Sequence, residues 1–274
     1  MRINLLWRDL FTAALIALFS FPLLWMLSYA LRPTDLPPPT RWQLFAPPFA
    51  FDNFARVGNF ISLNQFIFNS MIISAIAVPL TLLTASLAGL AMTQFSPRVQ
   101  RALVGITIGL MLVPAPAVWV PRFILFAEIG WIDTFAALIA PAVMGTNPFY
   151  VLIFYLAFSS VSREVYESAR LDGANLFQTW HAIALPLARP ALIAVALLSF
   201  TFYWSDYANA LLYLRSEVNY TLPVGVQFFK QIQPSNYPLL MAASVILVAP
   251  VLALFLIAQK FFLQGQVELA KWLR

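Results

Sequence analysis

The sequence predicts an all-α integral membrane protein with six transmembrane helices. Only 10% of its 274 residues are charged and 61% are hydrophobic, whereas a soluble domain carries roughly 25% charged residues. Uncharged runs of about 20 residues, the length that a membrane-spanning helix needs, recur along the chain. The 25 Phe and 8 Trp residues fit aromatic side chains at membrane interfaces. We therefore expect one membrane-spanning domain over residues 1–274.

The six expected spans follow from the apolar runs in order. The fifth run contains Asp206, and the sixth ends beside Lys260. The first run is longer than the ~7–15 apolar residues of a secretory signal, so we expect it to stay as a span. The expected spans are residues 10–31, 66–95, 102–120, 135–158, 191–214 and 238–262.

Prolines and glycines inside these runs predict where the helices bend or pack closely. Proline is tolerated in membrane helices because neighbours re-satisfy the freed carbonyl, so we expect bends at Pro22, Pro79, Pro141 and Pro250. In the third run, Gly105 and Gly109 form a G-x-x-x-G pattern, which allows close helix approach and arises equally often by chance.

The positive residues predict the orientation. Lys and Arg are enriched in cytoplasmic loops of membrane proteins. With both termini inside, the majority of the 16 Lys and Arg residues fall on the inner side. We therefore expect both termini to be cytoplasmic. This placement explains the net charge of +5 without a nucleic-acid partner.

Residues 159–189 form the expected cytoplasmic segment, and their pattern predicts two short helices joined by a turn. Asp172-Gly173 is a turn signal, and Asn175 is placed to cap the second helix. An apolar stripe follows on that helix, at Leu176, Trp180, Ile183 and Leu187. The pattern alone leaves three alternatives open: the segment lies on the membrane surface, packs under its own bundle, or docks a partner.

Several chemistries are excluded by residue content. The chain has no Cys and one His, so we expect no thiolate or histidine-rich metal site. A phosphate-binding loop needs G-x-x-x-x-G-K-[ST], but none of Lys230, Lys260 and Lys271 follows a glycine. His181 lies in the inner segment without a serine–acid partner set. We expect no catalytic residue, no metal and no ATPase site in this chain.

A short signature in the inner segment resembles a known family. Glu167-Ser168-Ala169, Asp172-Gly173-Ala174 and Ile183-Ala184-Leu185-Pro186-Leu187 are similar to the EAA motif of permease subunits of ATP-binding-cassette (ABC) importers. Ser168 stands where the family usually has Ala. Flanking stretches extend the resemblance to the second permease of carbohydrate importers of the maltose and glycerol-phosphate type. These stretches are Asp52-Asn53-Phe54, Asn69-Ser70, Gly130-Trp131-Ile132-Asp133-Thr134, Trp204-Ser205-Asp206 and Thr221-Leu222-Pro223-Val224-Gly225.

The resemblance implies a type I ABC importer permease with cytoplasmic coupling helices, placed in a prokaryotic cell membrane. Such a chain pairs with a second permease, two ATP-binding subunits and an extracytoplasmic solute-binding protein; ATP and Mg are bound by the ATPases, and no cofactor is bound here. The implied ATPase-coupling residues are Glu167, Ser168, Ala169, Asp172, Gly173, Ala174, Leu185 and Pro186. The candidate contacts for the binding protein are Tyr220, Thr221, Leu222, Pro223 and Gly225. The tail at residues 264–274 departs from the family pattern.

Asp206 marks the candidate translocation pathway. A carboxylate within a span is costly unless it is paired or faces water, so it suggests a functional site. The nearby aromatic and hydrogen-bonding side chains suit a sugar: Tyr203, Trp204, Tyr207 and Asn209. The structural alternative is that Asp206 holds two helices together.

Three other functions compete with sugar import. An ABC permease for a non-sugar solute shares the EAA segment. A self-contained channel or secondary carrier would need several intramembrane charges, but only Asp206 qualifies. A membrane enzyme would need paired carboxylates, His or Cys near one interface, and the sequence offers none.

Overall fold

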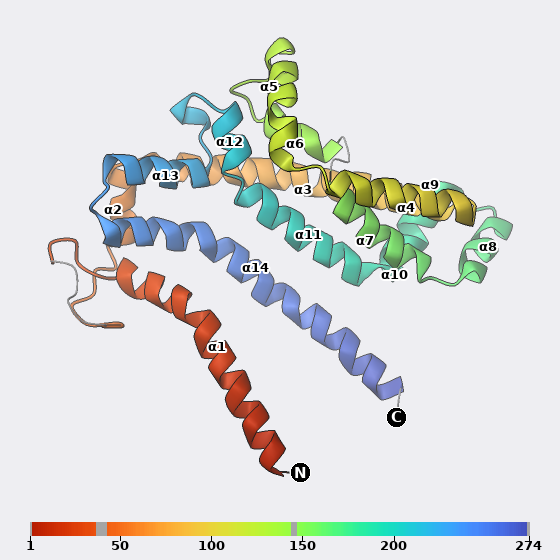
Figure 1. Cartoon of the computed structure of the whole chain (residues 1–274), viewed down its shortest axis with the longest axis horizontal. Coiled ribbons are helices and arrows are strands. Elements are labelled where there is room, and N and C mark those ends of the chain that lie inside the picture. The colour runs from red at the N-terminus through yellow and green to blue at the C-terminus, as the bar shows by residue number, and fades with distance from the viewer. Residues whose placement is uncertain (1, 37–42, 144–146, 273–274) are drawn as a thin grey trace. The chain divides into compact units, whose positions relative to one another are not determined.

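The computed structural model describes residues 2–36, 43–143 and 147–272, with side chains for 7–36, 43–143 and 147–261, and its regular elements there are all helical (Figure 1). The all-α prediction is confirmed over these residues. Two compact units are present, Met1–Gln65 with Leu222–Pro250, and Phe66–Thr221 with Val251–Arg274. Each unit is described by itself.

The first unit is built around α1 (Arg2–Ala30) and the loop that follows it. Its other elements are α2 (Asn53–Arg56), the 3₁₀ turn η1 (Val57–Asn59), α13 (Leu222–Ile232) and the start of α14 (Tyr237–Trp272). The buried Asn53 amide donates to the carbonyls of Ala30 and Arg32, both at 2.8 Å. Asn53 therefore ties α2 to the end of α1, which gives a structural reason for this residue in the family-like stretch.

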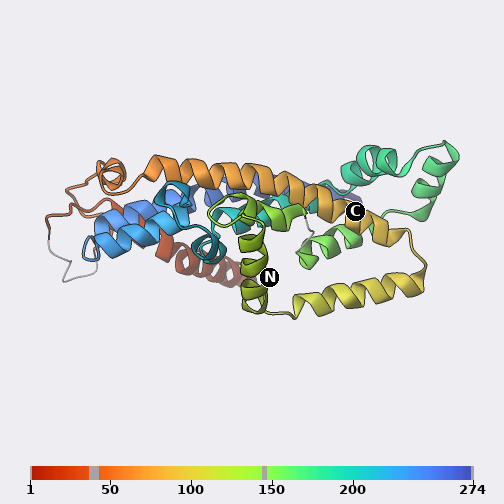
Figure 2. The same ribbon diagram turned by 90° about the horizontal axis from the view of Figure 1, so that it is seen from above.

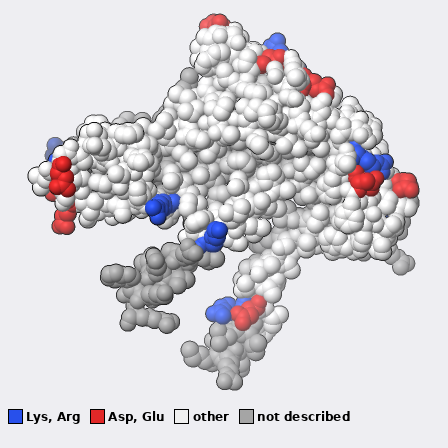
Figure 3. All heavy atoms as spheres, turned by 180° about the vertical axis from the view of Figure 1, so that it is seen from behind, with Lys and Arg blue, Asp and Glu red and all other residues white. Residues whose placement is uncertain are grey.

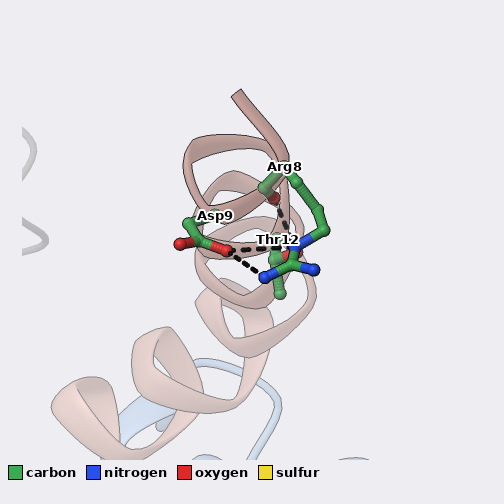
Figure 4. Close-up of polar contacts among 3 residues, drawn as sticks. All are labelled: Arg8, Asp9 and Thr12. Carbon is green, nitrogen blue, oxygen red and sulfur yellow. Dashed lines mark hydrogen bonds and ion pairs between the residues drawn. The ribbon is translucent and has the colours of Figure 1, made fainter. Parts of the chain in front are cut away.

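The charged start of α1 neutralises itself locally (Figure 4). Arg8 contacts Asp9 at 3.2 Å, and the Thr12 hydroxyl donates to the Arg8 carbonyl at 2.8 Å. Both charged side chains are exposed, so the pair contributes little stability. Its position before the apolar run is typical of the end of a membrane helix.

The second unit contains the remaining helices. Its long elements are α3, α4, α7 and α11, and a group of short elements follows α7 (Figure 2). The elements are α3 (Leu63–Thr93), α4 (Pro97–Met111), η2 (Ala115–Val118), α5 (Trp119–Glu128), α6 (Ala136–Val143), α7 (Pro148–Ser159), α8 (Arg163–Leu171), α9 (Leu176–Gln178), the π-helical η3 (Thr179–Ala184), α10 (Leu185–Leu187), α11 (Arg189–Trp204), α12 (Ala208–Tyr213) and η4 (Glu217–Asn219).

The expected spans at 10–31, 66–95 and 238–262 each lie largely in one helix, whereas those at 102–120, 135–158 and 191–214 are each shared by more than one element. Among the described residues, four helices are long and apolar enough to cross a membrane, and two bent pairs raise the number to six. Helices α1, α3, α6 and α14 each continue through their proline, so none of these four prolines ends its helix. The predicted span at 102–120 is not one helix, because α4 ends at Met111 and α5 turns away by 89° (Figure 2). Pro114 and Pro116 explain this break, since proline lacks an N–H and restricts the preceding residue.

The fifth expected span also divides. Helix α11 ends at Trp204, and α12 begins at Ala208. The 16 residues of α11 cover roughly 24 Å at 1.5 Å per residue, which is less than the ~30 Å of a hydrocarbon core. The break at 205–207 therefore exposes backbone polar groups that need a protein or water environment.

The core of the second unit lies where α3 and α7 approach each other. Phe154 and Phe158 stack at 5.6 Å and are fully buried with Leu90 and Val195. A Cβ added at Gly89 would lie 2.7 Å from the Phe154 Cβ and 2.8 Å from the Tyr155 nitrogen. The close approach of helices therefore occurs at Gly89. At Gly105 and Gly109, by contrast, an added Cβ would meet no described atom within 4 Å.

The surface carries few charges. Figure 3 shows one face, on which red and blue atoms form small separate groups within a mostly uncharged surface. Large apolar side chains are exposed on α1 and α4, including Phe19 at 75% and Ile106 at 60%. Such surfaces suit contact with lipid or another membrane subunit rather than water.

Candidate functional site

The inner segment folds into two short helices with the predicted turn between them. Helix α8 ends in a Schellman motif, in which the Gly173 N–H donates to the Arg170 carbonyl at 3.0 Å and the Ala174 N–H to the Ala169 carbonyl at 2.9 Å. Gly173 has φ +80°, a conformation that glycine adopts without a Cβ penalty. The turn signal at Asp172-Gly173 is therefore confirmed.

The start of the second helix is also as predicted. The Asn175 side chain accepts from the Gln178 N–H at 2.9 Å, and the Gln178 side chain accepts from the Asn175 N–H at 2.8 Å. This reciprocal arrangement is a capping box. The chain then passes through α9, η3 and α10 and bends by 87° into α11. We call residues 163–187 the elbow.

The inner face of the elbow is tied to the bundle by three contacts. The Trp180 indole N–H donates to the Ser86 hydroxyl of α3 at 3.0 Å, and both residues are buried. The Arg170 guanidinium donates to the Gln94 side chain, one residue beyond the end of α3. Burial raises the pKa of Tyr166, so its hydroxyl stays protonated and donates to the Phe158 carbonyl of α7 at 3.1 Å.

These contacts divide the predicted apolar stripe. Trp180 is 7% exposed, whereas Leu176 and Leu187 are 54% and 55% exposed. Trp180 therefore packs against its own helix bundle, which is one of the three alternatives that the pattern left open. Its side chain is not accessible to a partner. Ala184 and Ala188 are buried with it.

The outer face of the elbow carries the exposed apolar and acidic side chains. Leu171 is 89% exposed and Phe177 62%. Glu167 contacts Arg163 at 3.5 Å with both side chains largely exposed, so the pair is weak and the carboxylate is available to another cation. Of the predicted coupling residues, Ala169 is buried, Ala174 and Leu185 are half-buried, and the others are exposed: Glu167, Ser168, Asp172, Gly173 and Pro186.

The elbow and the long helices meet at one end of the second unit. In Figure 1, α8 lies beyond the ends of α4 and α7, and α9 overlaps α4 in this view, on the side of α11 where that helix begins. His181 is exposed here and stacks on Phe177 with a centroid distance of 6.3 Å. Its position suits a surface contact, as the sequence indicated.

A second polar cluster holds the loop after α12. Asp133 has φ +63°, and its carboxylate accepts from the N–H groups of Arg215 and Ser216 at 2.9 and 3.0 Å. It also accepts from the Ser216 hydroxyl and from the Asn219 amide. Asn69 of α3 donates to the Val218 and Tyr220 carbonyls at 2.8 and 2.9 Å. The family-like stretches that contain Asn69 and Asp133 therefore act as clamps on this loop.

The predicted contacts for a binding protein differ in how far they are exposed. Thr221, Leu222, Pro223 and Gly225 are buried, and Tyr220 is half-buried. Of the five predicted contacts, only Tyr220 presents an accessible side chain in this conformation. The exposed part of the same loop precedes it, at residues 215–218, and includes Val218 at 62% exposure.

The Asp133 clamp is expected to depend on charge. Partial desolvation acts to raise the pKa of Asp133, but the hydrogen bonds from Ser216, Arg215 and Asn219 together hold that pKa well below its ordinary value. A carboxylate with a depressed pKa stabilises the fold above its unfolded pKa, about 3.9 for Asp, and loses that effect as pH falls through the folded pKa. The clamp should therefore be complete from neutral pH down to about pH 5.

We expect Asp133→Asn to release the loop. One carboxylate serves four donors, and an amide group presents an N–H₂ where an acceptor is needed. Hydrogen exchange at the Arg215 and Ser216 amides should speed up about ten-fold or more at neutral pH. Glu217→Gln, on the same loop, is the control and should leave both amides protected. Equal protection in the Asp133→Asn variant and the wild type would assign the loop's order to Asn69 instead.

A cavity of about 830 Å³ lies within the second unit. It is lined by α3, the end of α4, η2, α5, α6, α7, α11, α12 and the segments between them, so it follows the breaks at Pro114 and Asp206. Polar and aromatic side chains among its described lining are Thr81, Thr84, Trp119, Arg122, Asn147, Phe149, Tyr150, Phe202, Tyr203, Asp206, Asn209 and Tyr213. A cavity of this size, mostly apolar with few polar groups, is typical of a small-molecule site.

The predicted pathway residues separate into two groups. Tyr203, Asp206 and Asn209 line the cavity, whereas Trp204 and Tyr207 do not. Trp204 is 2% exposed and stacks on Phe200 at 5.6 Å. Arg122 is not among the predicted pathway residues, because it lies outside the expected spans, between residues 120 and 135. Its place four residues before Phe126 in a short apolar stretch is the signal that the sequence offered.

Residues 77–266, more than half of the chain, match the family described as binding-protein-dependent transport system inner membrane component. The chain belongs to this family. It is a permease subunit of an ABC importer, an inner-membrane transport component. The EAA-like segment that suggested this permease family from the sequence lies wholly within the matched residues.

Curated relatives match nearly the whole permease. The trehalose/maltose transport system permease protein MalG of Thermococcus litoralis is 31% identical over 89% of this chain and 88% of its own length. The arabinooligosaccharides transport system permease protein AraQ of Bacillus subtilis is 28% identical over 93% and 92%. The melibiose/raffinose/stachyose import permease protein MelC of the same organism is 28% identical over 82% of each chain.

Solved structures confirm the fold of the permease. One is a bacterial ABC transporter involved in the import of the acidic polysaccharide alginate, with a TM-score of 0.79 at 21% identity over 95% of this chain and 97% of that chain. Another is a bacterial alginate ABC transporter in complex with an alginate pentasaccharide-bound periplasmic protein, with a TM-score of 0.68 at 16% identity over 94% and 93%. The type I ABC importer permease fold predicted from the sequence is thereby confirmed.

Proposed function

We propose that this permease imports a sugar or oligosaccharide, delivered by an extracytoplasmic binding protein and driven by ATP hydrolysis on two partner subunits. The elbow's exposed outer face carries the proposal, since leucine, phenylalanine and carboxylate side chains lie in water there without a packing role in their own bundle. The curated relatives named for sugar transport support the substrate class. ATP and Mg are bound by the ATPases, and no ATPase site is assigned to this chain.

In the proposed assembly the elbow enters a cleft of one ATPase. Leu171 and Phe177 supply an apolar contact of the helix-in-groove kind. Glu167 and Asp172 accept charge-assisted hydrogen bonds from basic groups of the ATPase. The elbow and both termini face the cytoplasm, and a second permease covers part of the exposed apolar surface.

Movement of the elbow reaches the cavity through α3. When the ATPases close, the Trp180–Ser86 and Arg170–Gln94 contacts pull on α3, and Tyr166 pulls on the end of α7. Helix α3 also carries Thr81, which lines the cavity and hydrogen-bonds to Tyr203 of α11 at 3.1 Å. Small shifts of packed helices of this kind convert ATPase closure into alternating access.

The proposed function is tested by co-expression with candidate ATPase and permease partners. We expect the chain to co-purify with an ATPase, and Glu167→Ala to reduce the recovered ATPase several-fold because one charged contact is lost. Glu128→Ala, an exposed acid at the end of α5, is the matched control. Failure of the wild-type chain to retain any ATPase would contradict the proposal.

The substrate class is tested separately in the assembled importer. Binding protein loaded with a saccharide should stimulate ATP hydrolysis. Stimulation by a loaded amino-acid or peptide binding protein, but by no saccharide, would replace the substrate class and leave the coupling proposal in place.

A further inference from the structure

The cavity of the second unit contains two opposite charges that do not touch. Among its described lining residues, Arg122 of α5 and Asp206 between α11 and α12 are the charged ones. No ion pair within 4.0 Å joins them, although Arg122 acts electrostatically on Asp206. An arginine and a carboxylate in a mostly apolar site would ordinarily pair directly. Here they are held apart by the elements that carry them.

Asp206 is fixed in its orientation. One carboxylate oxygen accepts from the Asn209 N–H at 3.1 Å, and the other accepts from the Asn209 side-chain amide at 2.9 Å. These bonds start α12 and explain why the carboxylate stays at the break. Each oxygen keeps a further lone pair, so Asp206 can still accept from a hydroxyl in the cavity.

The chemistry of these groups selects a solute. Arginine only donates hydrogen bonds, a carboxylate only accepts them, and a sugar hydroxyl does both. Adjacent hydroxyls can therefore bridge Arg122 and Asp206. Trp119 and Tyr150 also line the cavity, and aromatic side chains of this kind pack against the apolar side of a sugar ring. The charges of the described lining sum to zero. A carboxylate on the solute would gain from Arg122 but be repelled by Asp206.

We propose that Arg122 and Asp206 form a split pair that binds adjacent hydroxyls of an uncharged saccharide, so that this subunit itself contributes a substrate site. The inference rests on the proposed sugar import and adds the substrate's charge and the residues that hold it. The inferred substrate is uncharged, unlike the acidic polysaccharide alginate that is imported by the transporter with a similar fold.

The test is equilibrium binding of labelled saccharides to the assembled importer in nanodiscs without the binding protein, so that the affinity of that protein does not enter. The probes are matched pairs: galactose and galacturonate, glucose and glucuronate, and their trisaccharides. We expect saturable binding of at least one uncharged member, weaker binding of its uronate, and a rise of about ten-fold or more in Kd for Arg122→Gln and for Asp206→Asn. Arg122→Lys should recover part of the loss.

Matched controls separate this site from a purely structural role. Arg101→Gln removes an exposed arginine of α4 and should leave Kd unchanged. The double variant should cost less than the two single losses combined, because both groups hold the same solute. Unchanged Kd in either single variant, reduced assembly as the sole defect, preferential uronate binding, or no uncharged saccharide bound would each overturn the inference. ATP hydrolysis stimulated by saccharide-loaded binding protein, added to the same nanodiscs in a separate assay, would then show that the proposed import function still stands.

Discussion

Replacing Gly173 by Pro should abolish ATP-driven transport in the assembled importer. Gly173 is the left-handed residue of the Schellman motif that ends α8, with φ +80° and an N–H bonded to the Arg170 carbonyl. Proline fixes φ near −65° and has no N–H. The turn therefore cannot form, and the acids and Leu171 lose their position relative to the second helix of the elbow. We expect transport to fall at least 100-fold.

Substituting Asn, Ala and Pro in turn at position 173 tests whether transport needs the left-handed turn or only a glycine there. Asn tolerates the left-handed region and should keep most activity. Ala should lie between, since the left-handed conformation costs an L-residue roughly 1–2 kcal/mol. The two measurements are transport in proteoliposomes and ATPase recovered by co-purification. An active Gly173→Pro importer, or activity that does not follow the order Gly, Asn, Ala, Pro, would remove the turn from the coupling mechanism.

The elbow was predictable because its signals are local. The glycine turn and the Asn175 cap depend on residues three to five positions apart, and such spacing is visible in the sequence. The direction of the apolar stripe was not predictable. Periodicity shows that Leu176 and Trp180 share a face, but the partner of Trp180 is Ser86, 94 residues away. Only the fold shows that the stripe is divided between the bundle and the exposed surface.

The breaks in the spans and the cavity were hidden for a related reason. Hydropathy measures side chains, so it does not register the backbone groups that Pro114 disrupts or the helix start that Asp206 creates through the Asn209 N–H. Both breaks border the cavity, which brings Arg122 into range of Asp206. The expected spans leave Arg122 outside the membrane, between residues 120 and 135. The sequence therefore marked Asp206 as a charge within an expected span, but it did not show that Arg122 lies near it.

Replacing Gly89 by Leu should destabilise the second unit severely. Gly89 lies in α3 where α7 passes, and even a Cβ there would lie 2.7 Å from the Phe154 Cβ and 2.8 Å from the Tyr155 nitrogen. These neighbours are backbone-proximal atoms that cannot rotate away, so α3 and α7 must separate. Overpacking in a core typically costs about 1–3 kcal/mol, and we expect roughly 3 kcal/mol or more because both helices must move.

The control for Gly89 is another glycine of a neighbouring helix. Gly105→Leu in α4 places its side chain where no described atom lies within 4 Å, so the isolated chain should unfold at nearly the wild-type temperature. The measurement is thermal unfolding of the purified single chain in detergent, which avoids any effect of a second permease. Phe154→Ala should not rescue the Gly89→Leu variant, because the Cβ at position 154 and the Tyr155 nitrogen remain. Equal unfolding temperatures for the two leucine variants would mean that α3 and α7 do not pack through Gly89.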